Sequence, residues 1–165
     1  MPFDSRLSFC RLEVTVSMLT ITDALVAEHR VFADLFDEIE SLLCNVKTRA
    51  EVALLTSLVE RLLQRHAEAE KDLAYAALDH ALKHRGPVNR LHQDHEEIDE
   101  SFRRAQIAPD FAEARRLLKT AIAASRKHFK REERSVFPLL EETLRPDTQA
   151  ALGAAHIQPR AVPAR

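Results

Sequence analysis

A His-x-x-x-Glu motif occurs twice in this chain, and each copy lies within a stripe of apolar residues at helical spacing. The copies are His66 with Glu70 and His128 with Glu132. Residues four apart in a helix lie on one face, about one turn from each other. Such a stripe faces a helical core, where a carboxylate is costly unless it is paired or bound to a metal. One copy would be weak evidence, but the duplication indicates a built cluster.

Four long amphipathic helices are predicted, at about residues 20–44, 48–84, 87–108 and 110–145. Their starts are marked by capping pairs or by a proline in the first turn: Thr20 with Asp23, Thr48 with Glu51, Pro87, and Asp110 with Glu113. Pro138 lies inside the last helix and predicts a local kink. Only two glycines and 45% hydrophobic residues fit long helices around a core. Short connections then favour an all-α fold, an antiparallel up-down four-helix bundle.

The predicted bundle occupies residues 20–145, between an N-terminal extension at 1–19 and a C-terminal tail at 146–165. We expect at most one short helical turn in the tail before Gly153. Charged residues interrupt the apolar runs near the start, so neither a signal peptide nor a membrane span is expected. A net charge of −2 implies neither nucleic acid nor a membrane as partner, and we expect a cytoplasmic protein. The two cysteines, Cys10 and Cys44, form neither a disulfide framework nor a zinc knuckle.

The chain is built as two helical hairpins of the same design. The first and third helices read EHRVFADLF and DHEEIDESF, each with an acid before the histidine, and the second and fourth read HAEAEKDLAYAAL and HFKREERSVFPLL. With pseudo-twofold packing, the hairpins bring together four imidazoles and two carboxylates: His29, His66, Glu70, His95, His128 and Glu132. One histidine in an apolar stripe is more often a satisfied core residue. Four in register, two of them with a glutamate one turn on, favour a metal site.

The types of donor atom limit which metals the site would suit. Histidine and carboxylate without thiolate suit iron, manganese or zinc. The set has too many ligands for one tetrahedral zinc, and it suits two octahedral ions with bridging carboxylates. The ferritin-type site needs Glu-x-x-His, and no histidine here has a glutamate three residues before it.

Over about residues 20–145, the chain resembles the hemerythrin-like, HHE cation-binding domain family. The resemblance rests on EHR at 28–30, HAEAE at 66–70, DHEEID at 94–99 and HFKREERSVFPLL at 128–140. It implies a four-helix bundle that holds a non-haem di-iron centre with a bridging oxygen. Zinc or manganese could substitute for the iron ions. By the same resemblance, Glu70 and Glu132 would bridge the irons, and the terminal ligands would be His29, His66, His95 and His128.

One position departs from the oxygen-carrying hemerythrins, which have a further histidine four residues before the ligand of the third helix. Here that position is Leu91, and the nearest histidine is His92. His92 is a further candidate ligand, although a solvated position on the helix face is the favoured interpretation. Without it, the donors fill about ten of the roughly twelve positions of two octahedral ions. The resemblance therefore implies a more open centre than that of an oxygen carrier.

The resemblance implies a protein that binds O2, or reacts with peroxide or nitric oxide, as a sensor, scavenger or store. Two alternatives stay open: a di-iron enzyme of peroxidase or oxidase type, and an iron-responsive module that binds a protein partner. Binding is favoured over turnover, so no catalytic residue is assigned. The remaining candidates receive structural interpretations: packing for Tyr75 and Phe137, a solvated face for Glu133, the end of the second helix for His80 and His84, and the tail for His156.

Overall fold

The computed structural model describes residues 18–83 and 86–158, and no strand occurs among them. The helices are α1 (Ile21–Leu42), α2 (Arg49–Ala69), the π-helical segment η1 (Glu70–Tyr75), α3 (Ala76–Leu82), α4 (Gly86–Gln106), α5 (Phe111–Arg131), the π-helical segment η2 (Glu132–Val136), α6 (Phe137–Thr143) and α7 (Pro146–Ile157). The all-α prediction is confirmed. Most of the predicted N-terminal extension, and His84, lie outside the described residues.

The predicted helix starts are those of the structure. Thr20 precedes α1, where its hydroxyl accepts from the Asp23 N–H (3.1 Å) and the Asp23 carboxylate accepts from the Thr20 N–H (3.0 Å). Thr48 and Glu51 form the same reciprocal pair at the start of α2. Asp110 accepts from the Glu113 N–H at the start of α5. Each pair satisfies N–H groups that have no partner within the helix.

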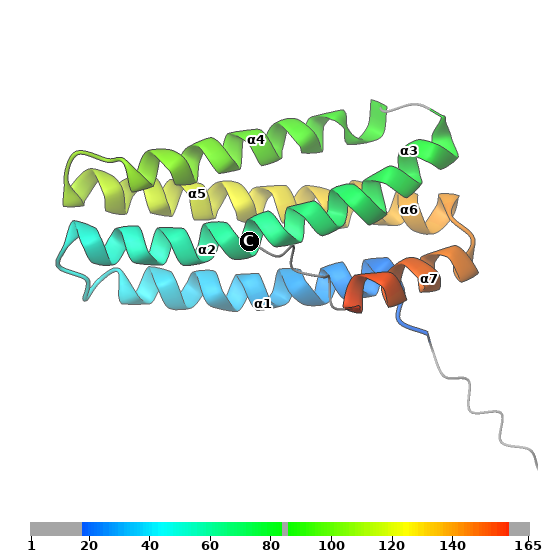
Figure 1. The fold of residues 1–165 in the computed structure, drawn as a ribbon, viewed down its shortest axis with the longest axis horizontal. Coiled ribbons are helices and arrows are strands. Elements are labelled where there is room, and N and C mark those ends of the chain that lie inside the picture. The colour runs from blue at the N-terminus through cyan, green and yellow to red at the C-terminus, as the bar shows by residue number, and fades with distance from the viewer. Residues whose placement is uncertain (1–17, 84–85, 159–165) are drawn as a thin grey trace, which may run out of the picture.

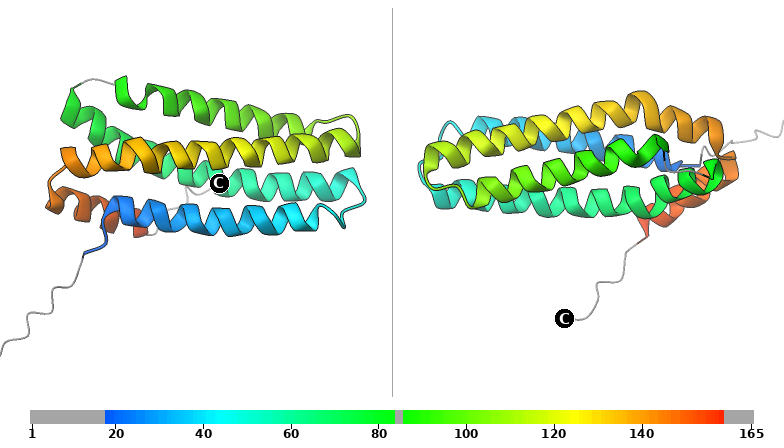
Figure 2. Two further views of the ribbon diagram at one scale, coloured as in Figure 1. Left: turned by 180° about the vertical axis from the view of Figure 1, so that it is seen from behind. Right: turned by 90° about the horizontal axis from the view of Figure 1, so that it is seen from above.

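Figure 1 shows α1, α2 with α3, α4, and α5 with α6 as long segments that lie side by side, and α7 beside the start of α1. The views from behind and from above in Figure 2 show the same arrangement. Two apolar clusters fill the space between the segments: one includes Phe36, Phe102 and Leu118, and the other includes Leu25 and Leu140. On every long segment, the histidines and glutamates of the predicted cluster lie between residues of these two apolar clusters.

The second and fourth helical segments are interrupted by π-helical turns, and each π-helical segment begins at the glutamate of a His-x-x-x-Glu motif. At the end of η2 the Phe137 N–H donates to the Glu132 carbonyl, five residues earlier. Pro138 follows in the first turn of α6. Because proline has no N–H and its ring clashes with the carbonyl four residues before it, a regular α-helix cannot continue here. The kink predicted at Pro138 therefore corresponds to this wider turn.

The expectation of at most one helical turn before Gly153 is wrong, because α7 spans 12 residues and Gly153 is buried inside it. A Cβ atom at Gly153 would lie 2.3 Å from the Leu19 carbonyl oxygen and 2.8 Å from the Thr20 carbonyl carbon. The glycine thus permits close approach of two backbones and does not end the helix. The Gln149 amide donates to the Leu144 carbonyl (2.9 Å), which further fixes α7. None of the described helices has the length and apolar content that crossing a membrane requires.

Gly153→Ala should lower the free energy of unfolding by about 1–3 kcal/mol, because the added methyl group meets backbone atoms that cannot rotate away. Alanine has the higher helix propensity, so a loss of stability would report the clash itself. The measurement is chemical denaturation followed by circular dichroism. Ala154→Ser, at an exposed position of α7, is the matched control that also adds one heavy atom. Equal stability of Gly153→Ala and wild type would contradict the close contact.

Candidate metal centre

The structure brings all six predicted residues to one place in the core. They come from six segments: His29 from α1, His66 from α2, Glu70 from η1, His95 from α4, His128 from α5 and Glu132 from η2. Each is buried, and both carboxylates are completely so. Because rigid helices carry these side chains, their spacing is set by helix packing and does not depend on a loop.

Two groups of potential ligand atoms can be distinguished. The first is formed by His29, His66 and Glu70, and the second by Glu70, His95, His128 and Glu132; within each group the ligand atoms lie within 4.8 Å of one another. Glu70 belongs to both groups. The Nε2 atoms of His29 and His66 are 3.1 Å apart. Two nitrogens at about 2.1 Å from one ion and at right angles to each other would be about 3.0 Å apart, so this spacing suits neighbouring ligands.

Each carboxylate lies between histidines of both hairpins. Glu70 Oε1 lies 2.9 Å from His66 Nε2, while Glu70 Oε2 lies 3.3 Å from His95 Nε2. Glu132 Oε2 lies 3.4 Å from His29 Nε2 and 3.3 Å from His128 Nε2. The two oxygens of Glu70 thus face different imidazoles, as those of a carboxylate that bridges two ions do, whereas Glu132 faces both of its imidazoles with one oxygen, Oε2.

The electrostatics of the cluster favour a cation. Both oxygens of Glu70, and Glu132 Oε2, are buried without a hydrogen-bond partner among the described side chains. Burial and the Glu70 charge raise the pKa of Glu132 well above its usual value, whereas burial is outweighed at Glu70 by His66 and other imidazoles, which hold its pKa low. Burial and the neighbouring His95 lower the pKa of His128 to about 3. Without metal, the cluster thus contains the neutral imidazole of His128 and two carboxyl groups, of which the charge on one opposes ionisation of the other.

Carboxylates behind the cluster orient its imidazoles. Glu28 Oε2 accepts from His66 Nδ1 (2.6 Å), and Glu133 Oε1 accepts from His29 Nδ1 (2.9 Å). Burial alone would raise the pKa of Glu28, but hydrogen bonds from His156 and His66 lower it to about 2, so it remains a carboxylate. Glu133 is exposed, in agreement with its interpretation as part of a solvated face, but that interpretation leaves out its contact with His29. Such partners fix the imidazole tautomer and leave Nε2 free for a metal.

The repeat contained a signal for these partners that sequence reasoning did not use. An acid precedes the lone histidine in both hairpins: Glu28 before His29, and Asp94 before His95. In the structure each acid turns to the histidine of its own hairpin's other helix, so that Asp94 Oδ2 lies 3.6 Å from His128 Nδ1. The second hairpin is less complete than the first, because neither His128 Nδ1 nor His95 Nδ1 has a hydrogen-bond partner in the described part of the chain. For His95, the residue of the first hairpin that corresponds to Glu133 is a lysine, Lys71.

The interpretation of Tyr75 as a packing residue is incomplete, because its hydroxyl donates to Glu132 Oε1. Its ring also stacks on His95, with ring centres 5.9 Å apart. Phe137 occupies the equivalent position of the second hairpin and stacks on His29 at 5.5 Å. In a regular α-helix a residue five positions after the glutamate points away from it, but the i→i+5 pattern of a π-helical turn brings it back to the same face.

The other histidines lie outside both ligand groups. His92 is half-buried, with its ring 5.5 Å from that of Tyr75 and perpendicular to it. This position lies outside both ligand groups and is partly exposed on the helix face. His80 is exposed. His156 does not lie in an unstructured tail: its Nε2 donates to Glu28 Oε1 (2.8 Å) from the end of α7.

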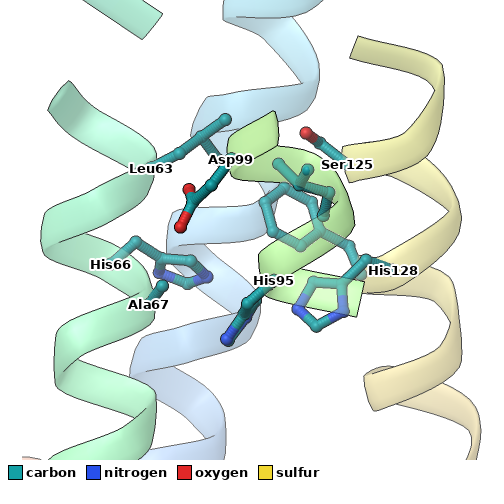
Figure 3. A pocket seen from close by; sticks show the side chains of 9 residues that line it. Leu63, His66, Ala67, His95, Asp99, Ser125 and His128 are labelled. Atoms are coloured by element: carbon teal, nitrogen blue, oxygen red, sulfur yellow. The ribbon is translucent and has the colours of Figure 1, made fainter. Parts of the chain in front are cut away.

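A small cavity borders the cluster, with room for a water-sized molecule. Figure 3 shows His66, His95 and His128 on one side of it, with Asp99 and Ser125 beyond them. Asp99 of α4 is exposed and Ala67 of α2 is half-buried, whereas Ser125 of α5 is buried, so the cavity extends from the imidazoles toward the protein surface between α2 and α4.

Comparison with known families agrees with this geometry. The family model described as the hemerythrin HHE cation binding domain matches residues 20–140. The chain belongs to this family. Cation binding is the property the family description states, and all six clustered residues lie within the hemerythrin domain, whereas α7 lies beyond it. No curated protein and no solved structure matches the chain.

Tyr75→Phe should destabilise the metal-free hemerythrin domain by about 1–3 kcal/mol, because Glu132 Oε1 would lose its donor in a dry core. The measurement is chemical denaturation after chelation. Ser125→Ala is the control, because it also removes a buried hydroxyl. That hydroxyl donates to a backbone carbonyl of the helix, Ala121, and not to a buried carboxylate. Equal losses in the two variants would mean that the Tyr75 hydroxyl has no special role at the carboxylate.

Proposed function

We propose that this protein holds a non-haem di-iron centre, with His29, His66, His95 and His128 as terminal ligands and with Glu70 and Glu132 as bridges. The observation that carries the proposal is the position of Glu70, whose two oxygens face the His66 and the His95 imidazoles. The donor set of imidazole and carboxylate without thiolate supports iron, with manganese or zinc as substitutes.

We further propose that the centre binds O2, or reacts with peroxide or nitric oxide, as a sensor, scavenger or store. Iron supplies ligand exchange and electron transfer for molecules of this kind. The protein supplies the access and the surroundings. The cavity that borders His66, His95 and His128 has room for a water-sized molecule, and the buried Leu91 donates nothing at the position of a fifth histidine. Phe129 stacks on His29 with ring centres 4.0 Å apart, which excludes water from that side.

The proposal includes an antiparallel up-down topology and a metal-binding unit at residues 20–145. The alternating direction of the long segments along the colour gradient of Figure 1 supports the topology. The family match at residues 20–140 and the positions of all six proposed ligands within it support the unit. The structure adds α7 to the C-terminal residues that follow this unit.

Protein purified without added metal should contain about two metal ions per chain, mainly iron. Glu70→Ala and Glu132→Ala should each remove most of it, because a bridging carboxylate serves both ions. Metal analysis by mass spectrometry measures the content. Glu68→Ala, exposed and two residues from Glu70, is the matched control, and His92→Ala should also retain the metal. At most one ion per chain, or complete loss in His92→Ala, would contradict the ligand assignment.

Reduced, iron-loaded protein should change its visible absorption spectrum with O2, peroxide or nitric oxide. The change should reverse when O2 or nitric oxide is removed, and after peroxide it should reverse when a reductant is added. The physical reason is the open coordination at the cavity. Continuous consumption of peroxide with a reducing co-substrate would instead favour the peroxidase-type enzyme. Absence of a spectral response to all three molecules in iron-loaded protein would contradict the proposed function.

A further inference from the structure

The C-terminal helix α7 is linked to the cluster of histidines and glutamates through a chain of two hydrogen bonds. His156 Nε2 lies 2.8 Å from Glu28 Oε1, and Glu28 Oε2 lies 2.6 Å from His66 Nδ1. The two oxygens of one carboxylate are thus divided between His156 and His66. Because α7 begins at Pro146, it lies outside the family match at residues 20–140. The helix is therefore an addition to the domain that supplies a contact to the domain's centre.

The second hairpin shows why such a contact is needed. Asp94, which corresponds to Glu28, is held by two arginines of the bundle itself: Arg131 forms an ion pair with it, and Arg90 Nε lies 3.1 Å from its Oδ1. In the first hairpin the residues at the corresponding positions are Ala69 and Ala24.

Neither alanine has a donor, and both are buried. The bundle thus provides no equivalent of Arg131 or Arg90 for Glu28, and α7 provides His156. The two halves of the repeat each anchor the carboxylate behind a cluster histidine, but with donors of different origin.

The position of His156 is fixed by the docking of α7. Its side chain is 8% exposed, whereas that of Glu28 is 40% exposed. Gly153, one turn earlier, lies against the backbone of Leu19 and Thr20. A carboxylate that is partly exposed can rotate toward water unless a second donor holds it, and the docked imidazole is in place to do so.

We infer that His156 is a positioning residue for the metal centre: it holds the Glu28 carboxylate so that this group fixes the orientation and tautomer of the His66 imidazole. The inference rests on the proposed di-iron function, because its consequence is the retention of metal. With Glu28 in place, His66 donates Nδ1–H to the carboxylate and directs the Nε2 lone pair at the cluster. Without His156, the carboxylate spends part of its time turned to solvent and His66 is less well oriented.

The test is the rate at which iron-loaded full-length protein releases iron to a strong chelator, in variants of both residues. Loss of a direct partner of a ligand typically costs about 10–100-fold in metal affinity, which is the expected increase in release for Glu28→Ala. His156→Ala acts one step further away, and we expect about a threefold to tenfold increase. Because both substitutions break the same chain, the double variant should release iron no faster than Glu28→Ala alone.

His156→Gln separates positioning from packing, since its amide nitrogen reaches about as far as Nε2 and can donate to Glu28. It should restore slow release, while the metal-free unfolding curves of His156→Gln and His156→Ala remain similar. Gly153→Ala, which forces α7 away from α1, should reproduce the faster release with His156 present. His80→Ala, an exposed histidine, is the control and should leave the rate unchanged.

Three results would overturn the inference: unchanged release from His156→Ala, no rescue by His156→Gln, or a double variant whose effect is the product of the single effects. Wild-type protein that takes up no iron would overturn the proposed di-iron function, and this role with it. Iron-loaded wild type with an unaffected His156→Ala variant would overturn the positioning role alone.

Discussion

Two fully buried carboxylates facing four buried imidazoles are the constraint on which this fold depends. Removing a carboxylate from water costs several kcal/mol unless other groups compensate it. The protein meets this cost in layers: the imidazoles face Glu70 and Glu132, Tyr75 donates to Glu132, and outer carboxylates hold the imidazoles. The apolar clusters on both sides separate most of this middle section from water. A cation shared by both carboxylates completes the compensation better than protons do, because it can contact both groups at once.

The sequence predicts the helical class and the convergence of the cluster well, because both follow from helical periodicity. Residues at positions i and i+4 of a long amphipathic helix must share a face, and the repeat places the two hairpins in equivalent positions. The predictions fail where a local conformation depends on tertiary contacts. A π-helical turn has no simple sequence signature, so the inward orientation of Tyr75 cannot be read from spacing alone. Glycine is typical of a helix end, so the sequence suggests that a helix stops at Gly153. Only the nearby backbone of Leu19 shows that the glycine is needed because two backbones pack closely there.

The two halves of the repeat are similar but hold different residues at several equivalent positions around the cluster. Equivalent positions hold Tyr75 and Phe137, so one carboxylate receives a hydroxyl and the other does not. Lys71 and Glu133 differ in charge, so His29 has an acidic partner where His95 has none among the described residues. Two ions bound here would therefore experience different surroundings. Partners of this kind raise the basicity of a ligand and fix its orientation, so the group containing His29 and His66 is the better supported of the two.

The role of α7 has a thermodynamic consequence that does not depend on which small molecule the centre binds. If docking of α7 strengthens metal binding through Glu28 and His66, metal binding must strengthen the docking of α7 by the same factor, because the coupling free energy between two sites is reciprocal. The contacts at Gly153 and Gln149 hold α7 in place without metal, so the helix need not detach when metal is lost. Its average position would nevertheless shift with the state of His66. A helix on the outside of the bundle would thereby become sensitive to the occupancy of a centre that is itself buried.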